Sequence, residues 1–171
     1  MNRMDVAMLI LRLCFGLSMA WHGLNKVRGP RGISGTAGWF ESIGMRSPML
    51  NARLAAATEI AAGIALAIGF ATPVASSAFV GLMVVAIVTV HWKVGFFVFL
   101  PHQGWEYCAS IAVTAVAIAL LGPGSISLDN AFGIAMFDSG PAAWLAAPIG
   151  IVAALCQLSL YWRPGRIREA S

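Results

Sequence analysis

The chain has 171 residues, of which 59% are hydrophobic and only 11% are charged, and its mean hydropathy is +0.81. A soluble domain carries about 25% charged residues, so this composition excludes an ordinary water-soluble protein and indicates a membrane protein. The net charge of +4 does not indicate nucleic-acid binding, because the basic residues stand at the ends of apolar segments rather than on one polar face.

Apolar segments along the chain predict an all-α integral membrane bundle with five spans in one domain, residues 1–171. The first span is expected at 6–24. A signal peptide is disfavoured because Asp5 lies beside the basic Arg3 and Arg12 interrupts the apolar core. Four further apolar segments follow, so we expect a retained span. The remaining spans are expected at 51–70, 74–90, 105–121 and 142–162.

Three connections between these spans have a recognisable character. Residues 36–43 form an amphipathic pattern and predict a short helix lying in the membrane interface. Residues 95–101 are apolar but too few to cross a bilayer, which favours a re-entrant or interfacial loop. Residues 125–141 are polar and contain Asp129 and Asp138, of which Asp129 is interpreted as a turn or cap residue.

The basic residues predict an orientation. With five spans the termini lie on opposite sides; the side of the C-terminus carries nine basic residues, whereas the other side carries only Arg3. The nine residues are Lys26, Arg28, Arg31, Arg46, Arg53, Lys93, Arg163, Arg166 and Arg168. Because basic loops stay in the cytoplasm, we expect a cytoplasmic C-terminus and an outside N-terminus.

Two charges lie inside the predicted spans. At 1.5 Å per residue, Glu59 lies about 12 Å and Arg12 about 19 Å from the cytoplasmic boundary. A long arginine side chain can cover the difference of about 7 Å. Since unpaired charges in hydrocarbon cost several kcal/mol, we predict a structural ion pair between Arg12 and Glu59.

Several polar residues are predicted to lie near the cytoplasmic boundary, with Glu59 deeper. They suggest a pocket for a quinone headgroup or a small anion, in which His22 donates to a quinone carbonyl and Glu59 or Glu106 carries the proton onward. The candidate catalytic residues are thus His22, Glu59 and Glu106, and the candidate cofactor-binding residues are His22, Lys26, Trp21, His91 and Trp105. The expected roof consists of Trp21, Trp92, Trp105, Phe96, Phe97 and Phe99.

Each of these residues also has a purely structural interpretation. Glu106 in the first turn of a helix is favoured by the helix dipole alone. His22 at a helix end would bond a carbonyl or a lipid headgroup, Lys26 would be a snorkelling anchor, and His102 would be solvated.

Metal and haem chemistry have little support in the sequence. Cys14, Cys108 and Cys156 are scattered through three segments without a Cys-x-x-Cys pair, so they are interpreted as small core residues, with a bond between two of them left open. No metal site is predicted. Haem between His22 and His91 is geometrically conceivable, but two histidines without a Cys-x-x-Cys-His motif are weak evidence for it.

A set of short motifs in a fixed order resembles the DoxX family of small bacterial membrane proteins across residues 6–133. The motifs are Arg12-Leu13, Trp21-His22-Gly23-Leu24-Asn25-Lys26, Glu59 with Gly63 and Gly69, Gly95-Phe96-Phe97, Gly104-Trp105-Glu106-Tyr107, Gly122-Pro123-Gly124 and Ser127-Leu128-Asp129. The resemblance implies a four-helix core in a bacterial inner membrane. The segment 142–162 lies beyond this core and is expected as an additional transmembrane helix, which could dock onto a larger assembly.

The resemblance also implies a redox association. The family is similar to the membrane subunit of thiosulfate:quinone oxidoreductase, and a mycobacterial relative is linked to a membrane complex with superoxide dismutase and a sulfurtransferase. Two functions are therefore weighed: a quinone-linked redox subunit, and a non-enzymatic accessory or anchoring subunit of a larger membrane complex. Proton or solute passage through the bundle is a third, supported only by the intramembrane charges. The expected partners are the lipid bilayer and other membrane subunits, not nucleic acid.

Overall fold

A computed structural model describes residues 2–134 and 140–164, and it is helical apart from one isolated bridge between Met45 and Trp162. In chain order the elements are α1 (Arg3–Arg28), α2 (Gly32–Ser42), α3 (Pro48–Ile68), α4 (Thr72–Ala86), the π-helical turn η1 (Ile87–His91), α5 (Glu106–Leu121), α6 (Leu128–Ala131) and α7 (Pro141–Tyr161). Asp138, Arg166 and Arg168 lie outside the described residues.

Four helices are long and apolar enough to cross a membrane: α1, α3, the continuous α4–η1 helix (Thr72–His91) and α7. Helix α5 is apolar but has only 16 residues. At 1.5 Å per residue it is about 24 Å long, shorter than a typical hydrocarbon core of about 30 Å. The expected all-α membrane bundle is confirmed, with four candidate spans and one shorter apolar helix.

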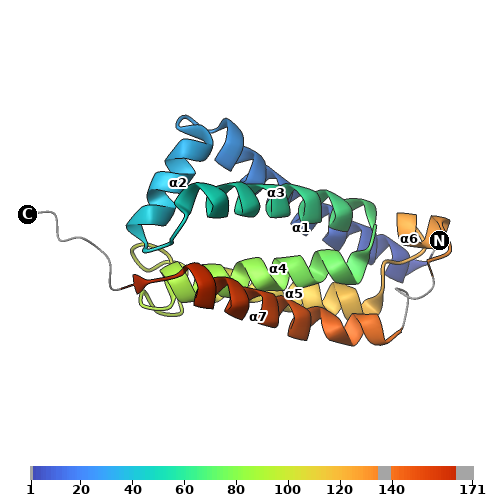
Figure 1. Cartoon of the computed structure of the whole chain (residues 1–171). Helices are drawn as coiled ribbons and strands as arrows, with labels where there is room; N and C mark the ends of the chain where they lie inside the picture. The colour runs from blue at the N-terminus through green and yellow to red at the C-terminus, as the bar shows by residue number, and fades with distance from the viewer. Residues whose placement is uncertain (1, 135–139, 165–171) are drawn as a thin grey trace, which may run out of the picture.

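The helices form two layers that converge at one end of the molecule (Figure 1). Helix α1 packs along α3 in one layer, with α2 beside them, and α4 packs against α5 and α7 in the other. The layers meet near α6 and diverge toward α2. We call these the α6 end and the α2 end.

Local sequence explains where the helices begin and end. Asn2 and Asp5 exchange side chain-to-backbone hydrogen bonds of 2.9 and 3.1 Å, a capping box that starts α1. Prolines stand at the first position of α3 and α7 and at the second position of α4, where the missing N–H costs nothing. Gly69 ends α3 with φ +66°, a left-handed conformation that favours glycine.

Small residues allow close packing within each layer. A Cβ atom on Gly16 of α1 would lie 2.6 Å from the carbonyl oxygen of Gly63 on α3, so the two backbones touch. In the other layer, the buried residues of α7 include Ala143, Ala146, Gly150 and Ala154, which recur every three or four positions. Such stripes let helices associate in lipid, where hydrophobic burial gives little drive.

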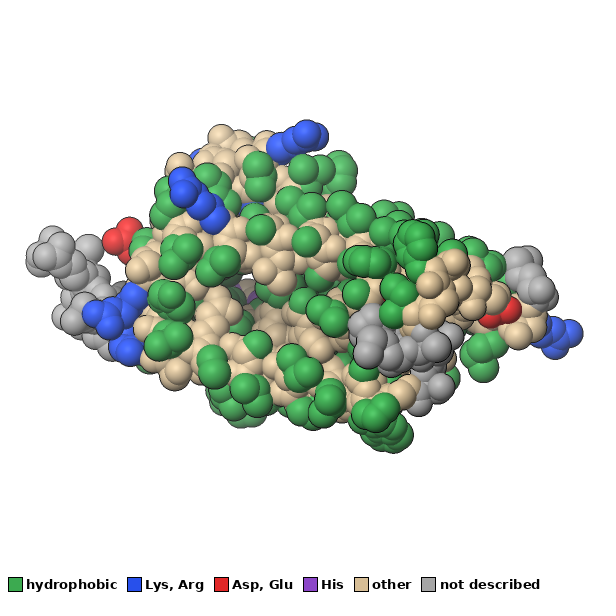
Figure 2. Space-filling model, turned by 45° about the vertical axis from the view of Figure 1, so that its right-hand side comes forward, with side chains coloured by type: hydrophobic (Ala, Val, Ile, Leu, Met, Phe, Trp, Pro, Cys, Tyr) green, Lys and Arg blue, Asp and Glu red, His purple; other side chains and the backbone are tan. Residues whose placement is uncertain are grey.

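The outer surface is apolar along its length and basic mainly at the α2 end. Hydrophobic side chains cover the face in Figure 2, with Lys and Arg side chains grouped toward α2. Among the described basic residues, Arg28 ends α1 and Arg46 and Arg163 follow α2 and α7 at that end, whereas Arg3 stands at the other. This is the surface of a multi-pass membrane protein.

Candidate functional site

A cavity of about 690 Å³ lies between the two layers at the α2 end; we call it the inner cavity. Its walls come from α1, α2 and α3 on one side and from α4, η1, α5 and α7 on the other. Most of the lining is aliphatic or aromatic. The polar side chains that reach it from several helices include His22, Lys26, Glu59, His91, Tyr107 and Gln157.

Glu59 and Lys26 form an ion pair on one wall of the inner cavity. Lys26 Nζ lies 2.7 and 2.6 Å from the two carboxylate oxygens of Glu59. The side chains are 21% and 10% exposed for Lys26 and Glu59, so the pair is largely shielded. The predicted Arg12–Glu59 pair is therefore wrong: Lys26, interpreted from sequence as a cofactor-binding residue or a snorkelling anchor, pairs with the carboxylate instead.

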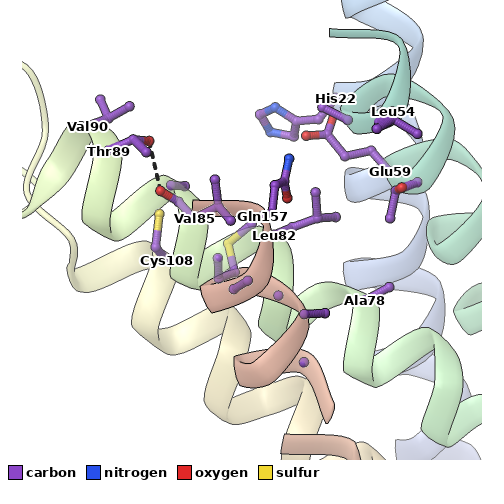
Figure 3. Close-up of a pocket in the computed structure, with 18 of the residues that line it drawn as sticks. His22, Leu54, Glu59, Ala78, Leu82, Val85, Thr89, Val90, Cys108 and Gln157 are labelled. Carbon is purple, nitrogen blue, oxygen red and sulfur yellow. Dashed lines mark hydrogen bonds between the residues drawn. The ribbon is translucent and has the colours of Figure 1, made fainter. Parts of the chain in front are cut away.

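His22 projects into the inner cavity beside Glu59 (Figure 3). It lies one helical turn before Lys26, so both side chains share a face of α1. Within residues 2–134 and 140–164 its ring makes no hydrogen bond to protein. Among the described residues, no protein group therefore occupies either ring nitrogen.

His91 reaches the opposite wall with both ring nitrogens occupied. Nδ1 lies 2.7 Å from the carbonyl oxygen of Gln103, and Nε2 lies 2.7 Å from the Tyr107 hydroxyl oxygen. Because a carbonyl only accepts, Nδ1 carries the proton, and Tyr107 donates to Nε2 of the neutral ring. His91 stands at the end of η1, a π-helical turn of the kind that often marks functional sites.

Sequence reasoning did not identify Tyr107 as a site residue. The signal was present, because a tyrosine inside an apolar helix needs a partner for its hydroxyl group. The partner, His91, is sixteen positions away, and only the fold brings the two together.

The inner cavity opens sideways between α3 and α7. Leu54 on α3 and Ile149 on α7 both line it and are 46% and 53% exposed on the outer surface. The surface in Figure 2 is hollowed between the two layers, with hydrophobic side chains around the hollow. Since α3 and α7 are both candidate membrane spans, we expect this opening to face lipid rather than water.

The C-terminal end of α7 fastens the two layers together at the α2 end. Gln157 Nε2 donates to Asn51 Oδ1 over 3.0 Å, and Trp162 Nε1 donates to the Ile43 carbonyl over 3.0 Å. Backbone bonds also link Gly44 with Arg163 and Arg46 with Tyr161. The fifth apolar segment therefore forms a wall of the cavity and does not stand apart from the core.

The aromatic roof differs from the one expected. Trp39 and Phe40 of α2 line the inner cavity, whereas the predicted roof residues do not. Trp92 stacks on Trp105 with ring centroids 6.0 Å apart, and Phe96 packs edge-on against Trp105 at 4.7 Å. These rings form an exposed apolar group of their own, and Trp21 points outward from α1.

Glu106 also lies away from the inner cavity. Its Oε2 accepts a hydrogen bond of 3.0 Å from the backbone N–H of Val98. This bond holds residues 95–101, which we call the Phe-rich loop, against the start of α5. The structure thus assigns Glu106 a loop contact in place of the expected position as a second proton carrier. His102, directly after this loop, is exposed, as predicted.

Arg12 lies at the α6 end, far from this cavity. It is 1% exposed and donates to the carbonyl oxygen of Ile126, and the absence of a side chain on Gly69 makes room for its guanidinium group. Asp129, also buried, supplies the nearby negative charge. The predicted deep position of Arg12 is right, but its countercharge comes from α6 and not from α3.

Asp129 itself clamps the start of α4. Its carboxylate accepts from the backbone N–H groups of Ala71 and Thr72 at 2.7 and 3.0 Å, and from Thr72 Oγ1 at 2.8 Å. The predicted cap role is confirmed, although the helix it caps is α4 and not its own.

The cysteines and possible metal ligands add no second site within the described residues. All three cysteines are free; Cys108 is buried beside the inner cavity, as a core residue should be, whereas Cys14 and Cys156 are exposed. No group of three or more His, Cys, Asp or Glu side chains that could hold a metal ion is found there.

Comparison with known proteins gives a family match. The sequence model of the DoxX family matches residues 7–92. A Bacillus subtilis (strain 168) protein named "Putative oxidoreductase CatD" is 31% identical over 125 residues, which cover 73% of this chain and 86% of that protein. No solved structure matches the chain.

Proposed function

The chain belongs to the DoxX family, and we propose that it is a redox-associated membrane subunit that binds a quinone headgroup in the inner cavity. The observation that carries the proposal is the lateral opening at Leu54 and Ile149, which joins an apolar cavity to the bilayer. A quinone is dissolved in the bilayer and needs this kind of entrance. The relative's name, an oxidoreductase, agrees with redox chemistry.

The polar groups of the cavity suit the two ends of a quinone ring. His22 has free ring nitrogens on one wall, and the Tyr107 hydroxyl group is held by His91 on the other. His22 can donate to a quinone carbonyl oxygen on one wall, and the Tyr107 oxygen, whose hydrogen goes to His91, can accept from a quinol hydroxyl group on the other, while the aliphatic lining accepts the ring faces. Glu59 beside His22 is then the proton carrier for the quinol state. Haem does not suit this arrangement, because both nitrogens of His91 are already bonded.

Quinone extraction from the purified protein tests the proposal. We expect about one quinone per protein chain, a loss of at least tenfold in occupancy for His22→Ala, and partial recovery for His22→Gln, which keeps a donor. Ala86→Phe should also empty the cavity, because Ala86 lines it, whereas the control Ala57→Phe adds the same ring on the exposed face of α3. No quinone in the parent protein would refute the proposal.

The alternative is a non-enzymatic accessory or anchoring subunit. The outward face of α7 favours it, because Trp144, Leu145 and Val152 are exposed there and would suit a neighbouring transmembrane helix as well as lipid. Stable co-purifying membrane subunits together with a quinone-free cavity would decide for this alternative.

The proposed topology has five passes in a bacterial inner membrane, with α5 as the short fourth pass of a four-helix core and α7 as the additional C-terminal pass. Basic side chains at the α2 end support a cytoplasmic position for that end and for the C-terminus. A fluorescent-protein fusion after Ser171 should fluoresce, and a phosphatase fusion there should be inactive. The reverse pattern would overturn the orientation.

A further inference from the structure

A second hollow lies against the inner cavity at the corner between α1 and α2; we call it the corner pocket. It is shallower, has a volume of about 430 Å³, and is lined by the Gly-rich turn that contains Arg31 and by Thr36 of α2. Lys26 and Trp39 line both hollows. These two side chains therefore form the partition between them.

Lys26 combines a fixed backbone with a flexible side chain within this partition. Its backbone carbonyl accepts a hydrogen bond of 3.4 Å from Thr36 Oγ1, so the backbone is fixed to α2. Its flexible stem carries the ammonium group to Glu59 on the inner side. Rotation of that stem would bring the same ammonium group to the corner pocket, whose wall it already forms.

We propose that Lys26 and Glu59 form a gate between the inner cavity and the corner pocket, through which protons pass between a bound ligand and water. The identity of the ligand rests on the proposed function, whereas the gate is a property of the two hollows. His22 adjoins Glu59 on the inner wall and Arg31 borders the outer pocket. The other titratable groups of the inner wall are His91, Tyr107, Cys108 and Tyr161.

The proton balance of one passage is simple. A ligand hydroxyl group loses its proton, directly or through His22, and an O–H bond forms on Glu59. The neutral carboxyl group no longer attracts the Lys26 ammonium group, which turns to the corner pocket and gives a proton to water. The neutral amine returns and takes the proton from Glu59, which restores the charged pair. One proton has crossed and no electron has moved.

The rate of thiol labelling measures how often the gate opens, and this measurement needs no quinone. Ala86 lines the inner cavity from α4, so Ala86→Cys, in a chain whose three native cysteines are alanine, places a reporter beyond the gate. The probe is a small anionic methanethiosulfonate added to protein in lipid nanodiscs. We expect Glu59→Gln to label about tenfold faster than the parent, because the charged pair that holds Lys26 inward is gone. Lys26→Arg keeps a pair and should remain slow.

A bulky side chain that fills the corner pocket tests whether the anionic probe enters the inner cavity by that route. Thr36→Trp combined with Glu59→Gln should return labelling to the parent rate, since Thr36 lines only the corner pocket. A lipid-soluble maleimide, entering between Leu54 and Ile149, should label all variants equally and thereby shows that their cavities are intact. Unchanged labelling in Glu59→Gln, or fast labelling that survives Thr36→Trp, would overturn the gate. Absence of bound quinone would refute the proposed function and leave this result standing.

Discussion

The two ends of the bundle use buried charge in different ways. At the α6 end, Arg12 and Asp129 are each 1% exposed and are surrounded by packed backbone. At the α2 end, Lys26 and Glu59 are paired on the wall of a cavity of about 690 Å³. A buried charge with no space beside it can only hold the fold, whereas one beside a hollow can meet a ligand. This contrast predicts that substitutions at the α6 end mainly cost stability and that those at the α2 end mainly change binding.

The largest loss of stability is expected for Asp129→Ala. The substitution leaves the N–H groups of Ala71 and Thr72 unpaired and removes the charge that faces Arg12. Breaking such a buried arrangement costs about 3–5 kcal/mol in free energy of unfolding, measured in detergent by denaturant titration. Asp129→Asn keeps one acceptor oxygen and should lose roughly half as much. Equal stability of all three proteins would contradict a structural role for this end.

Gly69→Ala is the next largest expected effect. Gly69 has φ +66°, and an added Cβ atom would collide with Nη1 of Arg12. We expect a loss of about 2–3 kcal/mol in free energy of unfolding, from backbone strain and displacement of the guanidinium group. Gly38→Ala in α2 is the matched control, because a Cβ atom there meets nothing within 4 Å. It should be neutral or stabilise by up to about 1 kcal/mol, since alanine favours helices.

The spans could be predicted from sequence because lipid imposes length and apolarity on each one. The expected segments 6–24 and 51–70 became α1 and α3, with ends displaced by a few residues where Asn2 and Pro48 start the helices earlier. Depth along a helix was also predictable, so Arg12 was correctly placed far from the basic end. Depth does not reveal which helix lies opposite, and the partner of Arg12 is therefore not deducible from its depth.

Lys26→Met tests the α2 end of the comparison. The substitution leaves the Glu59 carboxylate without its ion pair, but the cavity beside it can admit water, so we expect a loss of only about 1–2 kcal/mol in free energy of unfolding. Lys26→Arg should lose less. A loss as large as that of Asp129→Ala, measured in the same titration, would show that this pair is structural too.

The candidate site was only partly predictable for a related reason. His22, Lys26 and Glu59 share the cavity wall because they occupy facing positions on adjacent helices, which spacing and topology indicate. Trp39 and Tyr107 were missed, since their contributions depend on how α2 folds over the opening and how η1 turns His91 toward α5. Rotation of a helix about its axis leaves little trace in an apolar sequence.

Tyr107→Phe should have a smaller effect on stability than any substitution of a charge. It removes one hydrogen bond to His91 Nε2 and leaves that nitrogen facing the cavity, at a cost of about 1 kcal/mol. If the Tyr107 oxygen accepts from a quinol hydroxyl group, occupancy by the reduced quinone should fall by about tenfold. Tyr161→Phe is the control, because Tyr161 also lines the cavity but its hydroxyl group makes no hydrogen bond to the described protein groups. Equal occupancy in both variants would remove Tyr107 from the site.

Glu106→Gln is expected to change stability least. It also checks most directly which residues at the α2 end belong to the ligand site. Glu106 accepts one hydrogen bond, from the N–H of Val98, and glutamine keeps an oxygen for it, so the loss should be about 0.5 kcal/mol or less. Because the side chain lies outside the inner cavity, quinone occupancy and thiol labelling of Ala86→Cys should both stay at the parent level. Loss of quinone from the cavity in Glu106→Gln would extend the site into the Phe-rich loop and restore Glu106 as a proton carrier. The unchanged result confines proton transfer to His22, Glu59 and Lys26, on the one wall that borders both hollows.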